Sequence, residues 1–314
     1  MMVRYLIERL LWTTATLVGM SVVAFSLVAL APGDPISAEL RFLGVPAKPE
    51  TLEALRREYD LDAPLPERYV RWATRVVRLD LGRSIASGRP VAGELARALP
   101  STLALAFVTL VLIIVISVLA ASLVIIPAPP WVDRLLQGAT VAALSVPVYW
   151  VALAALTVGL LWLRVPGLLD SDSWANLGVA SILLACAPGL SIGRIIRERV
   201  AAERSEDYVR FGTALSLSGR QILFTDIGRV VAPAFVTLLA NSFGFLLGGS
   251  IVMERVFNRP GLGSLALQAI AARDYPVLQS YLLLSGTLFV FVNAVADLLS
   301  VWADPRLRRV GDHA

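Results

Sequence analysis

Six apolar runs, 17 to 29 residues long, limit the folds open to this chain more than any other feature of its sequence. A helix of that length crosses the roughly 30 Å hydrocarbon core of a bilayer, where a spanning segment must pair its own backbone groups. Of the 314 residues, 57% are hydrophobic and 17% charged, against about 25% charged in soluble domains. We therefore predict an all-α membrane protein with six transmembrane helices, at 10–31, 99–126, 135–163, 176–192, 230–251 and 281–302.

The first run could also be a cleaved signal peptide, because it ends in Ala29-Leu30-Ala31. Its apolar part is longer than the about 7–15 residues of a signal sequence, so we expect an uncleaved anchor helix within 1–32. The next stretch, 33–98, carries charges of both signs and reads as a solvated segment with short packed helices around Leu55 and Trp72.

Three residue counts exclude several classes of function. The only lysine, Lys48, lies outside any Gly-Lys-Ser/Thr phosphate loop, so the chain cannot be an ATP-hydrolysing subunit. The only histidine is His313, next to the end, and the only cysteine is Cys186. A histidine-based metal site, a catalytic triad and an internal disulfide are therefore excluded. The net charge of +4 comes without a basic, aromatic-rich soluble patch, so we expect no nucleic-acid partner.

A polar segment, 199–233, separates the fourth and fifth apolar runs. Its apolar side chains recur at helical spacing, which predicts an amphipathic helix and then a turn at 217–219. We expect a second short helix from Arg220 that stops before Pro233, because proline cannot donate a backbone hydrogen bond. The segment could be an ordinary solvated loop or a rigid helix–turn–helix that fits a groove in a soluble partner. The apolar side chains of the first helix are Ala201, Tyr208, Phe211, Ala214 and Leu215.

The residues of this segment resemble the "EAA" coupling loop of ABC importer permeases, and most closely that of the dipeptide/oligopeptide/nickel permease family. The likeness rests on 207–210 (DYVR), the small residues 212–214, the turn, Arg220 and Pro233. Two positions depart from the family pattern, since Ser216 stands where a turn glycine is usual and Asp226 where a histidine is usual. The resemblance implies an ATPase-coupling role for Tyr208, Arg210, Phe211, Gly212, Ala214, Gly219 and Arg220.

Other stretches resemble the same family. After the first run comes APGDP at 31–35, followed by YDLDAPLPERYVRW at 59–72 and LDLGRSI at 79–85. The segment 254–279 resembles the family nearly residue for residue, and its middle, 265–272, is a helix too short to span a membrane. By itself that helix could lie on the membrane surface. The chain closes with DPR at 304–306, as the family does.

Polar and aromatic side chains within the runs are candidates for the pathway or its gate. Tyr149 and Trp150 follow Pro147, which bends the third run and could equally be a packing kink. Asn293 and Asp297 lie four apart and share a helix face, where a carboxylate serves either a pathway or a structural contact. The remaining candidates are Asn241, whose small neighbours could simply form a packing face, and Glu254.

The distribution of arginines sets the expected orientation. Both termini fall on one side of six spans, and most short-loop arginines fall there too. The positive-inside rule makes that side cytoplasmic, while the long segment after the first run is exempt. The cytoplasmic arginines are Arg4, Arg9, Arg134, those from Arg194 to Arg229, Arg306, Arg308 and Arg309; the opposite short loops hold Arg164, Arg255, Arg259 and Arg273.

The resemblance implies a type I ABC importer permease fold in the bacterial cytoplasmic (inner) membrane. An anchor at 1–32 precedes an extracytoplasmic segment at 33–98 and a five-helix core at 99–304, which contains the coupling loop 194–229 and leads into a cytoplasmic tail at 305–314. The implied partners are a second homologous permease subunit, two ATP-binding cassette subunits, an extracytoplasmic substrate-binding protein and the lipid bilayer. ATP and Mg would be bound by the partner ATPase subunits, and no cofactor or catalytic residue is expected in this chain.

Peptides, nickel or a metal chelate are the substrates that the resemblance implies, and the lack of core histidines disfavours a bare metal ion. The alternative function is an autonomous secondary transporter or channel. Such a protein needs ionisable groups near the membrane midplane, and Asp297 is the one carboxylate within the runs.

Overall fold

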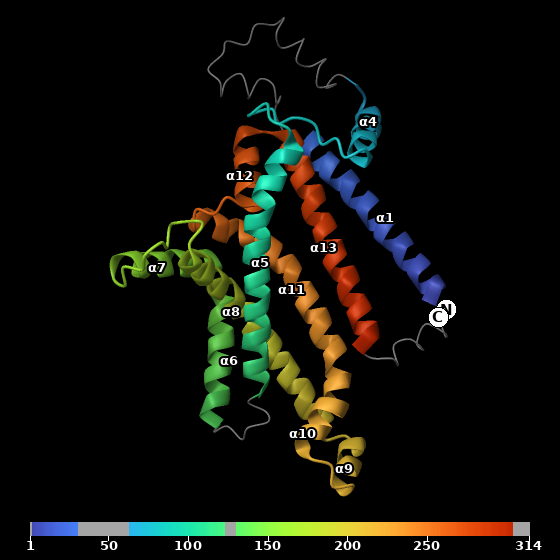
Figure 1. Ribbon diagram of the computed structural model, residues 1–314, viewed down its shortest axis with the longest axis vertical. Coiled ribbons are helices and arrows are strands. Elements are labelled where there is room, and N and C mark those ends of the chain that lie inside the picture. The colour runs from blue at the N-terminus through green and yellow to red at the C-terminus, as the bar shows by residue number, and fades with distance from the viewer. Residues whose placement is uncertain (1, 31–62, 123–129, 304–314) are drawn as a thin grey trace, which may run out of the picture. The chain divides into compact units, whose positions relative to one another are not determined.

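The computed structural model describes residues 2–30, 63–122 and 130–303 (Figure 1). Within these ranges the regular elements are helices, apart from an isolated bridge between Arg83 and Pro90. The chain divides into two compact units, Met1–Thr102 with Pro260–Val290, and Leu103–Arg259 with Phe291–Ala314. The motifs at 31–35 and 304–306, the expected helix around Leu55 and the tail at 305–314 lie outside the described residues.

The first unit contains α1 (Met2–Ala29), α4 (Leu65–Val77), the start of α5 (Val91–Ser122), α12 (Leu262–Ala272) and most of α13 (Tyr275–Ala303). Aromatic side chains join α4 to α1, with the ring of Phe25 5.5 Å from that of Tyr69 and 5.7 Å from that of Trp72. The hydroxyls of Ser21 and Tyr69 are 2.8 Å apart. The expected packed helix around Trp72 is therefore confirmed.

Asp274 fixes the segment before α5 to the junction of α12 and α13. Its buried carboxylate accepts hydrogen bonds from the Ser84 hydroxyl and from the backbone N–H groups of Ile85 and Ala86. Nearby, the Thr102 hydroxyl accepts from the first N–H of α12, at Leu262, over 2.8 Å. The loop and short-helix residues singled out in the sequence are thus tied together by buried bonds.

Helix α5 begins at Val91, so the expected start of this helix at residue 99 is wrong. Val91, Leu95 and Ala98 recur on one helical face and are buried. Burial of this face extends the helix in the N-terminal direction beyond Pro100, which therefore lies inside α5. Proline costs one backbone bond there, and the packing of the preceding turns compensates.

The second unit is built on α8 (Trp174–Glu203) and α11 (Gly228–Val256), which pack together. Helix α6 (Pro130–Ser145) packs on α8, and α7 (Val148–Leu161) contacts both α8 and α11. Small residues allow α5 and α8 to approach closely: a Cβ on Gly193 would lie 2.6 Å from that of Ala120, and Ser117 donates to the Gly189 carbonyl over 3.0 Å.

The third apolar run is two helices rather than one kinked span. Helices α6 and α7 meet at 100° (Figure 1). Pro147, expected to bend a single helix, instead lies at the break between two, where its extended backbone precedes the first turn of α7. The residue before a proline is also driven out of helical geometry, so Val146 leaves the helix together with it.

Four described helices are long and apolar enough to cross a membrane, and the bent pair raises the number to as many as five. The four are Val91–Ser122, Trp174–Glu203, Gly228–Val256 and Tyr275–Ser300. In α1 the apolar helix is the shorter stretch Leu11–Leu27. The all-helical, multi-pass character expected from the sequence is confirmed.

Candidate functional site

The polar segment between α8 and α11 forms a helical hairpin beyond the ends of these two helices (Figure 1). It contains α9 (Asp207–Ala214), α10 (Gly219–Gln221) and the π-helical turn η1 (Ile222–Ile227). The expected helix–turn–helix is present, but two of its predicted boundaries are wrong.

Ala201 does not belong to the same helix as Tyr208 and Phe211, as the sequence predicted, but to α8. Helix α8 ends at Glu203, and the next N–H groups, of Ser205 and Glu206, bond only three residues back. This tighter turn separates α9 from α8.

The second correction concerns Pro233, which does not end a helix. The chain runs from α10 through η1 into α11, with Pro233 inside α11. A π turn shifts the backbone register within a continuous helix, and the helix beyond it is held by packing on α8.

Gly212 is the point at which α9 rests on η1. It is buried, and a Cβ there would lie 3.4 Å from Cδ1 of Ile222 and 3.6 Å from Cδ1 of Leu217. A single Cβ would still be in ordinary contact there, whereas a side chain much larger than that of alanine would push α9 away from η1.

Ser216 carries the backbone strain of the hairpin turn. Its φ is +61°, in the left-handed region, which costs a non-glycine residue about 1–2 kcal/mol. The N–H of Leu217 donates to the Gly212 carbonyl over 3.1 Å, which closes the turn behind α9. Ser218 then caps α10 by accepting from the Gln221 N–H. The position where the family usually has a glycine is thus the one that needs a glycine-like conformation, and Gly219 begins α10.

Large apolar side chains cover the outer side of α9. Phe211 is 68% exposed, Leu215 61% and Tyr208 39%. Their spacing places them on one side of the helix, and we call these three residues the α9 face. Arg210 lies beside them, 3.7 Å from Asp207 in a fully exposed pair that contributes little to stability.

Tyr208 also fastens α9 to the end of α8. Its hydroxyl donates to a carboxylate oxygen of Glu203 over 2.7 Å. Desolvation, the hydrogen bond to Glu203 and the nearby charges of Glu206 and Asp226 raise the pKa of Tyr208 above its ordinary value. The phenol therefore stays protonated at physiological pH and keeps donating, which holds the ring in place on the α9 face.

The other predicted coupling residues belong to the same hairpin. Ala214 ends α9 with an exposed side chain, and Gly219 is exposed at the start of α10, which also contains Arg220. The structure thus brings the predicted coupling residues together on one short element.

The predicted pathway residues are dispersed. Tyr149 and Trp150 lie exposed in the first turn of α7, with ring centroids 6.4 Å apart. Asn241 is exposed on α11, and the half-buried Asn293 and Asp297 lie on α13. Their pathway role stays a prediction.

Glu254 belongs to a buried polar cluster at the opposite end of α8 and α11 from the hairpin. It is fully buried, and its charge acts on the buried guanidinium of Arg259. Burial lowers the pKa of Arg259, while the charges of Glu254 and Asp172 act against that shift. Arg259 donates to Oδ1 of Asn176 over 2.9 Å and to the Ser171 carbonyl over 3.1 Å.

Asn176 completes this cluster, and sequence reasoning missed it. Its Nδ2 donates to the carbonyls of Leu168 and Phe257, each over 2.8 Å. Every polar atom of its side chain is therefore bonded. Its position as a polar residue at the start of an apolar run was the one available signal.

Comparisons with known proteins agree over almost the whole chain. Residues 113–309 match the family described as binding-protein-dependent transport system inner membrane component, and residues 2–106 match its N-terminal part. The glutathione transport system permease protein GsiC of Escherichia coli (strain K12) is 34% identical over 310 residues, covering 98% of this chain and 99% of the relative. GsiC of Shigella boydii serotype 4 (strain Sb227) matches to the same extent.

Proposed function

This chain belongs to the family of binding-protein-dependent transport system inner membrane components, as a permease subunit of an ABC importer of the peptide type, and on that premise we propose that its α9 face docks an ATPase subunit. A multi-pass chain of this family works in the inner membrane with a substrate-binding protein and ATPase partners. The proposal names the surface through which one of those partners acts.

The observation that carries the proposal is the exposed aromatic pair on a hairpin that is otherwise polar. Phe211 and Tyr208 leave apolar surface in water although the hairpin is rigidly built, with Gly212 packed on η1 and Tyr208 bonded to Glu203. Aromatic side chains that fill a partner's pocket dominate many interfaces. Arg210, at the margin, would contribute more to the rate of association than to affinity.

Transport then follows from linkage between two states. ATP binding closes the two ATPase subunits, the hairpin moves with the subunit that holds the α9 face, and the helices change from an inward-facing to an outward-facing arrangement. The rigid join between hairpin and helices supports this, because Tyr208 ties α9 to α8 and η1 continues directly into α11. This chain supplies the movement of the pathway, and its partners supply ATP hydrolysis.

The assembly that we propose contains six spans from this chain, a second homologous permease, two ATPase subunits and a binding protein. α1 would be the remaining span, since its apolar stretch Leu11–Leu27 reaches the lower end of the about 17–25 apolar residues that cross a bilayer. Asn241, Asn293, Asp297, Tyr149 and Trp150 stay candidates for the pathway between the two permeases.

Orientation is tested by labelling single cysteines in intact cells, in a Cys186→Ala background. Ala201→Cys, exposed near the end of α8, should react only after the membrane is opened to the cytoplasm. Ala86→Cys, exposed in the segment held by Asp274, should react from outside. The opposite pattern would show that the termini are not cytoplasmic, and the docking proposal would fail with it.

Docking is tested by cross-linking in the assembled transporter. In the same background, Phe211→Cys should cross-link to an ATPase subunit that carries a cysteine in its surface groove, and ATP should change the yield. Asn241→Cys, exposed on α11, is the matched control and should not cross-link. Equal yields from both positions would contradict docking through the α9 face.

For the substrate, we propose a short peptide rather than a metal ion. The supporting relatives are named as glutathione permeases, and glutathione is a tripeptide. Within the described residues no group of three or more His, Cys, Asp or Glu side chains is placed to hold a metal ion. Uptake of labelled glutathione, a labelled dipeptide and nickel by the reconstituted transporter distinguishes the candidates, and uptake of nickel alone would overturn the proposal.

A further inference from the structure

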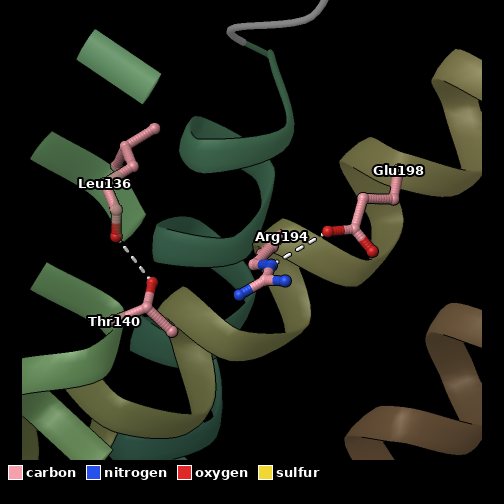
Figure 2. Close-up of polar contacts among 4 residues, drawn as sticks. All are labelled: Leu136, Thr140, Arg194 and Glu198. Carbon is pink, nitrogen blue, oxygen red and sulfur yellow. Dashed lines mark hydrogen bonds and ion pairs between the residues drawn. The ribbon is translucent and has the colours of Figure 1, made fainter. Parts of the chain in front are cut away.

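A cavity in the second unit lies between the end of α5, the middle of α6 and the second half of α8. Its volume is about 200 Å³, and it is open on one side. Leu136 and Thr140 on α6 and Arg194 on α8 line this space, and Figure 2 shows these three residues. None of the residues assigned to docking or to the pathway lines it.

The walls of this cavity differ in chemistry. Leu136, Leu190 and Ala120 form an apolar part, while Arg194, Arg197 and the amide of Gln137 supply hydrogen-bond donors. Thr140 is satisfied by its own helix, because its hydroxyl donates to the Leu136 carbonyl over 2.7 Å (Figure 2). The ligand that fits has an anionic, hydrogen-bond-accepting end and an apolar end.

The charges of the lining favour an anion. Arg194 is paired through its Nε with Glu198 at 2.9 Å, a half-exposed pair that leaves the other two nitrogens of its guanidinium able to donate (Figure 2). Arg197, one turn further along α8, brings a second guanidinium to the lining.

Exposed apolar side chains lie on the two helices that line this cavity together with α8. Leu119 on α5 and Leu135 and Leu144 on α6 are each more than 60% exposed. A soluble anion would gain nothing from this surface, whereas the acyl chains of a lipid would cover it. Basic pockets between membrane helices on the cytoplasmic side are a known type of lipid-headgroup site.

We propose that this cavity binds an anionic phospholipid, with the headgroup phosphate on Arg194, Arg197 and Gln137 and the acyl chains along α5 and α6. The bound lipid would brace the end of α8 just before the hairpin begins. The leaflet in which it lies rests on the proposed orientation of the chain, but the binding itself does not.

Native mass spectrometry of the full chain in detergent tests this proposal. Dioleoyl-phosphatidylglycerol should bind, and dioleoyl-phosphatidylcholine, with the same acyl chains, should bind far more weakly. Arg194→Gln with Arg197→Gln should weaken phosphatidylglycerol binding about 30-fold, the loss expected for two basic side chains near an anionic headgroup. The matched control, Arg199→Gln with Arg229→Gln, removes the same charge from exposed positions outside the cavity and should leave binding unchanged.

Two further measurements complete the test. One distinguishes a lipid headgroup from a soluble phosphate, and the other controls for misfolding of the variants. Glycerol 3-phosphate should not displace the lipid at millimolar concentration, and effective displacement would show a site for soluble anions instead. Arg194→Lys with Arg197→Lys keeps the charge and should retain most of the binding, which shows that the helices are intact.

Equal binding of the two lipids, or equal binding by the cavity and control variants, would overturn the proposal. Loss of the bound lipid when the chain assembles with the second permease would also overturn the proposal, because it would show that this surface is part of the interface between the two permeases. Because the readout needs neither an ATPase subunit nor transport, its failure is distinct from a failure of docking.

Discussion

The two ends of the α8–α11 pair place similar kinds of side chain in opposite environments. At the end that contains Asn176 and Glu254, charged and polar groups are buried and bonded to one another. At the hairpin end, charged groups lie in water and it is Phe211 and Leu215, the apolar groups, that are exposed. One end is closed on itself, and we propose that the other is completed by a partner.

The energies of buried and exposed side chains predict that the two ends will respond differently to mutation. A buried charge that loses its partner costs several kcal/mol, so the Asn176 end should contribute to stability. Removing an exposed aromatic side chain costs the isolated chain little, and the same side chain can carry much of a binding energy. Stability and docking should therefore be separable by mutation along one helix pair.

The largest expected effect is loss of the buried cluster. Asn176→Ala removes two donated bonds and one accepted bond at fully buried positions, so the free energy of unfolding should fall by about 3 kcal/mol or more. The measurement is the unfolding transition of the full chain in detergent. Asn241→Ala, at an exposed asparagine on α11, is the control and should change it by less than about 0.5 kcal/mol. Equal effects would mean that the buried cluster is not a stabilising clamp.

An intermediate effect is expected where α9 meets η1. Gly212→Leu should push α9 away from Ile222, at a cost of about 1–3 kcal/mol to the hairpin. Limited proteolysis between α8 and α11 should become faster, while the rest of the chain keeps its unfolding transition. Gly212→Ala is the matched control, since its Cβ meets only flexible side-chain ends and alanine favours the helix by about 1 kcal/mol. If both variants are cleaved at the wild-type rate, the hairpin is not held by this contact.

The smallest expected effect is a gain in stability. Ser216→Gly relieves a left-handed serine, and the more flexible unfolded chain offsets part of that relief. The hairpin should become more stable by about 1 kcal/mol or less, seen as slower hydrogen exchange at Leu217 and Gln221. Docking should not change, because Ser216 is not part of the α9 face. Faster exchange in this variant would show that the serine side chain is needed in the turn.

The sequence was sufficient to predict the features that depend on the spacing of apolar residues and on the positions of proline and glycine. Apolar run length predicted the four long membrane helices, and the spacing of Tyr208 and Phe211 predicted α9. Pro147 predicted a bend in the third run, although not its division into α6 and α7. The missing turn glycine pointed to Ser216, which has the left-handed backbone.

The sequence was insufficient wherever packing overrides a local signal. Pro100 and Pro233 lie inside helices because buried neighbours hold the turns around them. The 100° angle at Pro147 is set by contacts of α7 with α8 and α11, which no local pattern encodes. Asn176 is distant in the chain from Phe257 and Arg259, so only the fold brings their bonds together.

The central claim is that the hairpin end is completed by an ATPase subunit through the α9 face. Its most direct test is the affinity of the purified ATPase subunit for the permease, with Tyr208→Ala and Phe211→Ala combined. Each truncated anchor typically costs about 2 kcal/mol, so affinity should fall at least about 30-fold with an unchanged unfolding transition. Trp162→Ala with Trp174→Ala, which removes two exposed aromatic side chains outside the hairpin, should bind like the wild type. Wild-type affinity in the Tyr208/Phe211 variant would contradict the claim, and the hairpin would then be a solvated loop.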